Sequence, residues 1–538
     1  MDLAFVRDSS ALQQVLVGLI LLTLLFNISR ALYNILGHPL ASLPGPKFAG
    51  ATPFWLLYHT FRLRKCEVLD ECLSRYGPVV RIAPNKVLIS SQTDIKTVYG
   101  IGAKFVKSDF YPPWGLDGAS NIFSTTDPKD HSLRRAITAR TFSKNSIVKF
   151  MPKMEEHAVS LVRNLRARCD VKDGDQGVTR STTTVEFLKM ARYMALDMLG
   201  SSVLGEDFQL LKTGREHPFV HDLDSATLII PTRATVPSWL WATVFKHLPV
   251  ARWQHHLGGE ARLSEYARET VHRAFAAADG AGGKADDRPP TLVSSYANYE
   301  DETTGRHLST ERIVGEIAAV YFAGTDTTSN TLTFAMYEIA RRPDVQQKLR
   351  DEVVDAHRKA RRSRSEATAH AVTESDDGVL EMSHAILENC PYLEAFISES
   401  LRLYAAIPSH LERVVPQAGV TLSTGHKLPA GTVIGVQTYS LHRDPVIFPQ
   451  PHHFDPDRWL RGTPEMRKAL SPWGFGSRIC MGMHLAYIEF RLVIAAVVAN
   501  FLVCLPQGFD HDTMDMKNLW FVFPQGGKLD VDLTTIHS

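Results

Sequence analysis

One short segment near the C-terminus holds the residues with the clearest capacity for chemistry: Trp473-Gly474-Phe475-Gly476-Ser477-Arg478-Ile479-Cys480-Met481-Gly482. Glycines on both sides of Cys480 let the backbone turn tightly and approach a flat group closely. The next residues, about 484–500, have a helical pattern, so Cys480 precedes a helix N-terminus, where the dipole favours a thiolate. Arg478 adds a positive charge. The pattern favours a thiolate at Cys480, and the alternative is a buried structural cysteine beside a glycine-rich turn.

A long helix predicted from about Thr310 to Arg342 carries a second polar patch. Ser309 or Thr310 is expected to cap it and Pro343 to end it, which gives a length of roughly 50 Å. Its centre reads Ala323-Gly324-Thr325-Asp326-Thr327-Thr328-Ser329-Asn330. Such residues are poor helix formers in a helix interior. They indicate either a functional site or a kink with threonines bonded back to the helix.

A third pattern is the Glu-x-x-Arg spacing of Glu399 and Arg402, which is not distinctive by itself. Glu265…Arg268 and Glu338…Arg341 have the same spacing, and such pairs usually lie on a helix surface and contribute little. The segment Phe454-Asp455-Pro456-Asp457-Arg458-Trp459 follows Glu399 and Arg402 and precedes Cys480.

Together these segments resemble the cytochrome P450 superfamily. The cysteine segment resembles its haem-binding signature, Phe-x-x-Gly-x-Arg-x-Cys-x-Gly, with Trp473 where Phe is usual. The resemblance implies that Cys480 is the metal ligand of haem b, with Gly476, Arg478 and Trp473 beside the cofactor. It also implies that Glu399, Arg402 and Arg458 form a buried charge network that supports the cysteine loop.

The centre of the long helix resembles the oxygen-activating signature of the same family. The resemblance implies that Ala323 and Gly324 leave room for dioxygen and substrate over the cofactor. Thr327 would hydrogen-bond the dioxygen and Asp326 would help to relay protons from solvent. Asp326 and Thr327 are therefore the expected catalytic residues.

The haem propionates need cations, and the resemblance implies four positions for them. Asp130-His131-Ser132-Leu133-Arg134-Arg135 resembles the family's C-helix, where His131 and Arg135 would bind propionates, His131 replacing the common Trp. Arg413 and Arg478 match two further positions. The alternative for each arginine is an exposed side chain on the surface.

The resemblance also outlines a substrate pocket, formed by residues 107–124, 321–327, 405–410 and 521–524. These segments are rich in aromatic and apolar residues and so predict a lipophilic substrate, although ordinary packing would give the same pattern. Tyr321 and His410 are the polar candidates to orient a substrate. The expected pocket residues are Phe110, Trp114, Phe123, Tyr321, Ala323, Ile407, His410 and Phe521.

The N-terminus is apolar from Val15 to Ile28. This run is short for a membrane helix, which needs about 20 residues, but Ala11 and Leu12 extend it. A cleaved signal peptide is the alternative, and we favour an anchor because no clear cleavage site follows. The basic residues after the run outnumber Arg7 before it, which places the remainder of the chain in the cytosol.

Length and composition fit this organisation. The 538 residues carry 59 basic and 58 acidic side chains, a balance that gives no reason to expect a nucleic-acid partner. Six cysteines without a C-x-x-C pair argue against a disulfide framework. We predict a mainly α fold with small β-sheets, the P450 fold, after one transmembrane helix. Short strands are expected at residues 79–90 and 431–438. Exposed loops are expected at residues 279–290 and about 358–378, and the second loop starts with a basic run at residues 358–364. The expected divisions are a tail (1–10), the anchor (11–36), a proline-rich hinge (37–50) and the catalytic domain (51–538).

The resemblance implies a haem-thiolate monooxygenase that oxidises a lipophilic metabolite. His442-Arg443-Asp444-Pro445 and Ile407-Pro408 resemble fungal microsomal P450s of biosynthetic pathways. Such enzymes lie on the endoplasmic reticulum and take electrons from NADPH–cytochrome P450 reductase, in some cases with cytochrome b5. Two alternatives are a P450-type isomerase or dehydratase, against which Asp326 and Thr327 argue, and a haem-based sensor.

Overall fold

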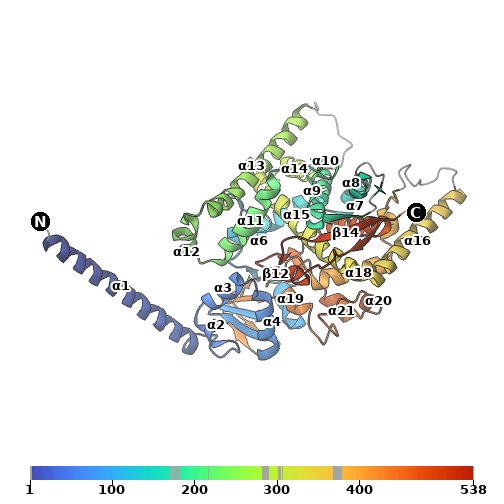
Figure 1. Ribbon diagram of the computed structural model, residues 1–538. Coiled ribbons are helices and arrows are strands. Elements are labelled where there is room, and N and C mark those ends of the chain that lie inside the picture. Colours follow the sequence, from blue (N-terminus) through green and yellow to red (C-terminus); the bar gives the residue numbers. More distant parts are fainter. Residues whose placement is uncertain are drawn as a thin grey trace. The chain divides into compact units, whose positions relative to one another are not determined.

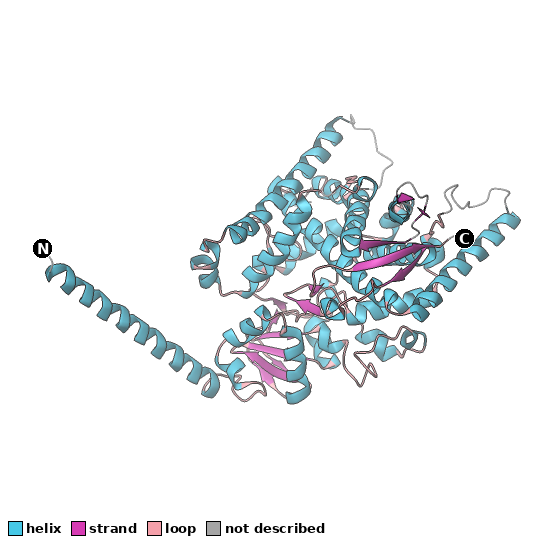
Figure 2. Cartoon of the chain, viewed as in Figure 1, coloured by secondary structure: helices cyan, strands magenta, loops and turns pink. Residues whose placement is uncertain are grey.

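The computed structural model describes residues 3–169, 172–173, 178–179, 182–215, 217–280, 290–300, 305, 307–367 and 379–536. The chain divides into two compact units, Met1–Val106 with His410–Ser440, and Lys107–Ser409 with Leu441–Ser538. Helices make up most of the described chain and the strands form small sheets (Figures 1 and 2). This is the mainly α architecture that the sequence predicts.

The first unit begins with helix α1 (Leu3–Leu36), the long blue helix in Figure 1. Its segment Gln14–Leu36 is long and apolar enough to cross a membrane, and the apolar window within it has no buried residue. Helix α22 (Met483–Asn500) meets the same criteria of length and composition but is 78% buried, as a core helix is. Helix α1 is therefore the candidate membrane anchor, and it starts eight residues before the expected boundary at 11.

The predicted hinge packs closely on strand β1 (Val79–Ala83). Gly45 has φ +153°, and a Cβ atom there would lie 2.4 Å from the Arg81 carbonyl oxygen, so no larger residue fits. The Arg81 N–H donates to the Pro44 carbonyl oxygen at 2.8 Å, and its guanidinium donates to the Asn34 carbonyl oxygen at 2.8 Å. Helix α2 (Lys47–Ala51) already starts inside the expected hinge.

A small sheet forms the centre of the first unit. Strand β1 pairs antiparallel with β2 (Lys86–Ile89), which pairs parallel with β10 (Val433–Val436), which pairs antiparallel with β7 (Arg413–Val414). The two predicted strand regions, 79–90 and 431–438, are confirmed. The other elements of this unit are α3 (Phe54–Phe61), α4 (Lys65–Tyr76), α5 (Gln92–Tyr99), β8 (Val420–Thr421) and β9 (Lys427–Leu428), with β3 (Val106–Lys107) and α19 (Thr438–Leu441) at its boundaries.

Helix α15 (Thr310–Ala340) is the predicted long helix and runs through the second unit. The Ser309 hydroxyl accepts the N–H of Arg312 and caps it, and Pro343 opens the next helix, α16 (Pro343–Ala367). Helix α15 packs against α9 (Phe187–Leu199), α13 (Ala251–Gly280) and α22. Helix α15 is buried along most of its length, so its packing fixes the positions of the polar residues at its centre.

The second unit also contains the remaining helices and strands. The helices are η1 (Pro112–Trp114), α6 (Pro128–Thr141), α7 (Lys144–Val148), α8 (Met151–Cys169), η3 (Gly200–Leu204), α10 (Leu210–Thr213), α11 (Phe219–Thr235), α12 (Ser238–Thr243), η4 (Phe245–His247), α14 (Leu292–Ala297), α17 (His384–Leu387), α18 (Pro391–Leu403), α20 (Asp457–Leu460), α21 (Pro464–Ala469), η5 (Gly476–Arg478) and η6 (His511–Met514). The strands are β4 (Lys172–Asp173), β5 (Val178–Thr179), β6 (Thr182–Glu186), β11 (Phe501–Cys504), β12 (Met516–Asn518), β13 (Val522–Pro524) and β14 (Asp530–Thr535), and β11, β14 and β6 form one sheet.

One sequence-based expectation is wrong in part. Residues 358–378 were expected to form an exposed loop, but α16 continues to Ala367. Arginine, lysine and alanine are good helix formers, and they extend the helix through the basic run. Residues 368–378, and residues 281–289 of the other predicted loop, lie outside the described residues.

Candidate active site

The cysteine loop closes on itself immediately before α22. The N–H of Cys480 donates to the Trp473 carbonyl oxygen at 2.9 Å, which makes the intervening residues a single tight loop. Gly474 and Gly476 have φ of +78° and +59°, conformations that residues with a Cβ adopt only at a cost. The glycines of the sequence motif are therefore required by the backbone of this loop.

The thiol of Cys480 is exposed, unlike the buried Cys66, Cys72, Cys169 and Cys390. Burial of the surrounding site raises its pKa above the usual value, whereas the N–H groups of Gly482 and Met483 and the guanidinium of Arg135 act to lower it. These donors stabilise the thiolate, and a metal ion bound to sulfur would displace the thiol proton. The donors come from the start of α22 and from α6.

The cations expected around the cofactor lie on three elements. In the second unit, Arg135 of α6 donates to the Ile479 carbonyl oxygen at 3.0 Å, and Arg478 donates to the Thr125 carbonyl oxygen at 3.1 Å. His131 of α6 is buried. In the first unit, Arg413 of β7 donates to the Glu412 carbonyl oxygen at 2.8 Å and lies over the Tyr99 ring. All four side chains are thus held by protein contacts in defined positions.

The structure brings Glu399, Arg402 and Arg458 together, and all three are buried. Arg402 donates from Nε and Nη2 to the Glu399 carboxylate at 2.8 Å each, a bidentate pair, and Arg458 Nε donates to Glu399 Oε1 at 3.0 Å. The Trp459 indole N–H donates to Glu399 Oε2 at 2.9 Å. Each oxygen of the buried carboxylate is therefore satisfied, which a buried charge requires.

His442 connects this network to the cysteine loop, and sequence reasoning did not assign it a role. Its Nδ1–H donates to the Arg402 carbonyl oxygen at 2.9 Å, and its Nε2 accepts the N–H of Ser471 at 2.8 Å. Burial lowers the pKa of His442 to about 3, so the ring is neutral, as these two bonds require. Ser471 lies two residues before Trp473, so the histidine positions the start of the loop.

The centre of α15 presents one open face in an otherwise buried helix. Ala323 is exposed and Thr327, one turn later, is partly exposed, while their neighbours Phe322 and Asp326 are buried. The Thr327 hydroxyl donates to the Ala323 carbonyl oxygen at 2.7 Å, the back-bonded arrangement that the alternative interpretation predicts, but its oxygen remains an acceptor on the open face. The expectation for Gly324 differs, because a Cβ there would lie 2.8 Å from a methyl of Leu199. Gly324 therefore allows α15 to approach α9.

Asp326 points away from the open face into an ion pair. Its Oδ1 lies 3.3 Å from Arg192 Nε on α9, and its Oδ2 accepts the Thr227 hydroxyl of α11 at 2.6 Å. Arg192 also lies 2.7 Å from Asp224. Burial lowers the pKa of Arg192, but Asp326 and Asp224 outweigh it and raise that pKa further above the ordinary arginine value. The sequence offered no signal for Arg192 or Thr227.

Aromatic residues from distant segments form one cluster in the second unit. Trp114 is its centre, with ring centroids 5.7 Å from Phe110, 5.4 Å from Phe123 and 5.9 Å from Phe521. Trp520, which the sequence did not single out, lies 5.2 Å from Trp114. Phe322 of α15 lies 5.3 Å from Phe521 and connects the cluster to the helix that bears Ala323. The partly buried Ile407 follows Ala406, whose carbonyl accepts the Val522 N–H at 2.9 Å.

Each of the two polar candidates has a hydrogen-bond partner within the protein. The Tyr321 hydroxyl hydrogen-bonds Thr270 of α13 at 2.7 Å, and its ring packs on Phe208 and Phe219, so we do not place it in the pocket. His410, in the first unit, hydrogen-bonds Glu412 at 3.1 Å. Burial lowers the pKa of His410, whereas Glu412 raises it.

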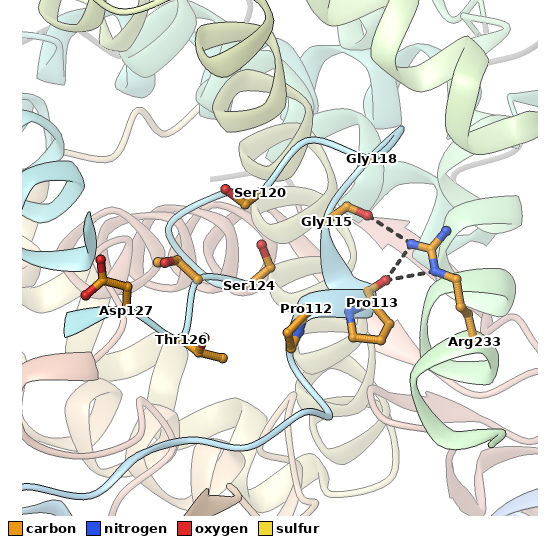
Figure 3. A pocket seen from close by; sticks show the side chains of 10 residues that line it. Pro112, Pro113, Gly115, Gly118, Ser120, Ser124, Thr126, Asp127 and Arg233 are labelled. Carbon is orange, nitrogen blue, oxygen red and sulfur yellow. Dashed lines mark hydrogen bonds between the residues drawn. The ribbon is translucent and has the colours of Figure 1, made fainter. Parts of the chain in front are cut away.

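A cavity of about 480 Å³ lies beside the loop that carries Trp114 (Figure 3). Most of its lining comes from that loop, and Arg233 closes one end. The lining residues are Pro112, Pro113, Gly115, Gly118, Ser120, Ser124, Thr125, Thr126, Asp127 and Arg233.

Comparison with known proteins identifies the family. The family model described as "Cytochrome P450" matches residues 48–529. The chain belongs to the cytochrome P450 family. Three relatives carry the name cytochrome P450 monooxygenase: tazI of Aspergillus terreus is 30% identical over 99% of this chain and 100% of its own length. Orf2 of Aspergillus niger is 27% identical over 95% of this chain and 96% of its own length. StcB of Emericella nidulans is 27% identical over 87% of this chain and 83% of its own length.

Cytochromes P450 are oxidoreductases that hold haem through a cysteine thiolate. The donor set here fits that cofactor. Within the part of the chain that the structure describes, no cluster of three or more His, Cys, Asp or Glu side chains could hold a metal ion by itself. Cys480 is instead a single exposed thiol on a loop built for close approach, and Ala323 leaves an open face on the helix that packs against α22. A haem supplies the remaining ligands itself, so one thiolate is sufficient.

Proposed function

We propose that this P450 is a haem-thiolate monooxygenase that hydroxylates or otherwise oxidises a lipophilic small molecule in secondary metabolite biosynthesis. The observation that carries the proposal is the exposed Cys480 thiol at the start of α22, in a unit whose central helix opens at Ala323 and Thr327. In the overall reaction a substrate C–H bond becomes C–OH with one atom of dioxygen. The other atom leaves as water with two protons and two electrons.

Haem, when bound, supplies the binding and reductive activation of dioxygen. Cys480 Sγ would hold the iron, with Gly476 and Trp473 in its loop. Arg135 and Arg478 supply positive charge beside the cysteine loop, and His131 and Arg413 are the further candidates to hold the propionates. Glu399, Arg402 and Arg458 stabilise the loop through His442 and take no part in the chemistry.

Asp326 and Thr327 are the proposed groups for proton supply. Thr327 presents its hydroxyl oxygen on the open face, where it can accept a hydrogen bond and pass on a proton. Asp326 is buried beside it, and Arg192 and Thr227 hold its carboxylate in one orientation. A proton from solvent must displace one of these contacts before Asp326 can carry it, so Arg192 controls the supply.

The aromatic cluster around Trp114 supports a lipophilic substrate. Phe110, Phe123 and Phe521 surround Trp114, and Phe322 joins them to α15. Rings in edge contact provide a large apolar surface that suits a flat or polycyclic molecule. Ile407 and Ala323 add small apolar surfaces. His410, whose Nδ1 has no hydrogen-bond partner among the described residues, stays a candidate for orienting the substrate.

Helix α1 would anchor the enzyme in the endoplasmic reticulum with its catalytic part in the cytosol. The exposed apolar segment Gln14–Leu36 and the basic residues that follow it support this placement. Electrons would then come from NADPH through the membrane-bound cytochrome P450 reductase, with cytochrome b5 as a second donor.

The first test is the absorption spectrum of the reduced, carbon monoxide-bound protein. Thiolate ligation gives a Soret band at a longer wavelength than histidine ligation does. We expect the thiolate spectrum from the natural protein and its loss in Cys480→His, which keeps a ligand and therefore the haem. A histidine-type spectrum in folded, haem-loaded natural protein would refute the proposal.

The second test separates oxygen activation from isomerase or dehydratase chemistry. In Thr327→Ala the yield of product per NADPH should fall roughly tenfold or more, with peroxide released instead. Thr333→Ala is the matched control, because Thr333 is also back-bonded within α15, to the Ser329 carbonyl oxygen at 2.7 Å, but is wholly buried. Product formation without NADPH or dioxygen would contradict a monooxygenase.

A further inference from the structure

Trp473 connects the cysteine loop to a tyrosine of α22. Its carbonyl oxygen accepts the Cys480 N–H at 2.9 Å, so one backbone hydrogen bond joins it to the cysteine. Its indole N–H donates to the Tyr487 hydroxyl at 3.3 Å. The two ring centroids lie 5.3 Å apart, with the ring planes inclined by 55°. Trp473 therefore contacts the cysteine through its backbone and a phenol through its side chain.

Tyr487 continues this chain of contacts towards solvent, because both aromatic side chains are partly exposed. The guanidinium carbon of Arg491, one turn further along α22, lies 5.5 Å from the Tyr487 ring centroid. Glu394 of α18 fixes that guanidinium and accepts from its Nη2 at 3.0 Å. Burial raises the pKa of the Tyr487 hydroxyl above its ordinary value, so the phenol keeps its proton at neutral pH. The chain thus ends in a phenol that still has a proton to lose.

Two other indoles of the second unit have different surroundings. Trp114 is 4% exposed, and its N–H has no hydrogen-bond partner among the described residues. Trp459 is 5% exposed, and its N–H donates to the carboxylate of Glu399 in the buried charge network. Of these three indoles, Trp473 is the one whose N–H meets a phenol near solvent.

An indole beside a phenol is suited to the transfer of single electrons. Both rings give up one electron to a strong oxidant, and an oxidised phenol becomes a neutral radical once its proton leaves. The Tyr487 proton can pass to water, because the residue is partly exposed. The positive charge of Arg491 is attracted to the electron-rich ring and makes loss of an electron harder. Weak oxidants therefore leave the pair intact.

We propose that Trp473 and Tyr487 form an electron relay that protects the haem site when peroxide oxidises it in the absence of substrate. The inference rests on the proposed function, because it takes Cys480 as the haem ligand. Hydrogen peroxide is the oxidant: its O–O bond breaks, and two electrons and two protons convert it to two waters. Trp473 supplies one electron and regains it from Tyr487, whose O–H bond breaks as its proton passes to water.

The tyrosyl radical is then reduced by a soluble hydrogen-atom donor such as ascorbate, which re-forms the O–H bond. A second passage through the pair supplies the second electron. Two ascorbates therefore lose one hydrogen atom each for every peroxide reduced. A purely structural role for Trp473 and Tyr487 would need their rings and no transfer of electrons.

Electron paramagnetic resonance of freeze-quenched samples tests the relay. Hydrogen peroxide is mixed with the substrate-free, haem-loaded full chain, and ring-deuterated tyrosine identifies a tyrosyl signal. The natural protein should give that signal, and Tyr487→Phe should lose most of it and show an indole radical instead. Tyr266→Phe is the matched control, because Tyr266 of α13 is also partly exposed and packs on an aromatic ring, that of Phe219, with centroids 5.6 Å apart. A tyrosyl signal of unchanged size and shape in Tyr487→Phe would refute the relay.

Bleaching of the haem by peroxide gives a second measurement. Ascorbate should prolong the life of the Soret band in the natural protein and in Tyr266→Phe. This protection should be lost in Tyr487→Phe and in Trp473→Phe, which places the usual residue of the family signature in the loop. Equal protection by ascorbate in all four proteins would overturn the proposal.

The spectrum of the reduced, carbon monoxide-bound protein separates this proposal from the proposed function. If the natural protein lacks the thiolate spectrum, the proposed function fails, and the relay fails with it. If the thiolate spectrum is present but the radical signal and the protection are the same in the natural protein and both relay variants, the relay alone is refuted.

Discussion

The Nε atom of Arg192 lies 3.3 Å from Oδ1 of Asp326 and joins α9 to the proposed oxygen-activating helix α15. Asp326 is 2% exposed, so its carboxylate depends on Arg192 and Thr227 for the interactions it loses to burial. Removing one partner of such a pair leaves an uncompensated buried charge. The ion pair therefore links α9 to α15 and also restrains the Asp326 carboxylate.

A double-mutant cycle should reveal this dependence. We expect Arg192→Gln to lower the free energy of unfolding by about 2 kcal/mol or more, because Asp326 stays buried without its cation. The double variant Arg192→Gln/Asp326→Asn should lose less than the sum of the single variants. Chemical denaturation of the haem-loaded proteins measures all four corners. Additive losses would mean that the two side chains do not interact appreciably.

The local chemistry of the site could be predicted from the sequence. Cys480, its glycines and the helix that follows are adjacent in the chain, and their backbone requirements are visible as residue types. The central polar patch of α15 was also evident, since polar residues stand out in a long apolar helix. The supporting network was predictable only by resemblance, because the spacing of Glu399 and Arg402 occurs elsewhere in the chain.

What the sequence could not provide was the identity of tertiary partners. Arg192 and Arg233 are ordinary arginines in helices until α9 and α11 pack, and His442 gains its role only when Ser471 folds back to it. Gly324 was expected to leave space over the cofactor, but packing against Leu199 explains it. Tyr321 was expected in the pocket, but its hydroxyl hydrogen-bonds Thr270 of α13. The sequence does not show which neighbouring helix a tyrosine hydroxyl will contact.

Trp473, the departure from the family signature, should leave the ligand environment of Cys480 nearly unchanged. Its indole N–H donates to the Tyr487 hydroxyl at 3.3 Å, and the two ring centroids lie 5.3 Å apart. It therefore does not compete with the backbone donors of Gly482 and Met483 for the sulfur. We expect Trp473→Phe to keep the reduction potential of the haem close to the natural value. A potentiometric titration measures it, and a large shift would mean that the indole acts on the thiolate.

His442 should matter for haem retention and for acid stability. Its folded pKa, about 3, lies below the ordinary 6.5, so the unfolded chain binds a proton there that the folded protein does not. Stability from this residue is complete above pH 6.5 and is lost as the pH falls towards 3. His442→Phe removes both hydrogen bonds and should speed haem loss, measured by transfer to apomyoglobin. His426→Phe, which changes a partly exposed histidine outside this network, is the control.

Glu489 should give the opposite pH dependence. This glutamate of α22 is 2% exposed, its Oε1 has no hydrogen-bond partner among the described residues, and its other contact is the Thr328 side chain. Burial raises its pKa to about 8, so the folded protein holds a proton that the unfolded chain releases near pH 4.5. The contribution is complete below pH 4.5 and is lost as the pH rises through 8, with a slope of at most about 1.4 kcal/mol per pH unit.

Glu489→Gln replaces this carboxyl with an amide that is neutral at every pH. The variant should therefore gain stability relative to the natural protein as the pH rises from 5 to 8, when both are unfolded thermally across that range. Infrared difference spectra give an independent measurement, because the carbonyl band of a protonated carboxylic acid should disappear near pH 8 in the natural protein and be missing from the variant. Parallel stability curves for the two proteins would mean that Glu489 is ionised in the fold. The buried carboxylate would then need a cation that the described contacts do not supply.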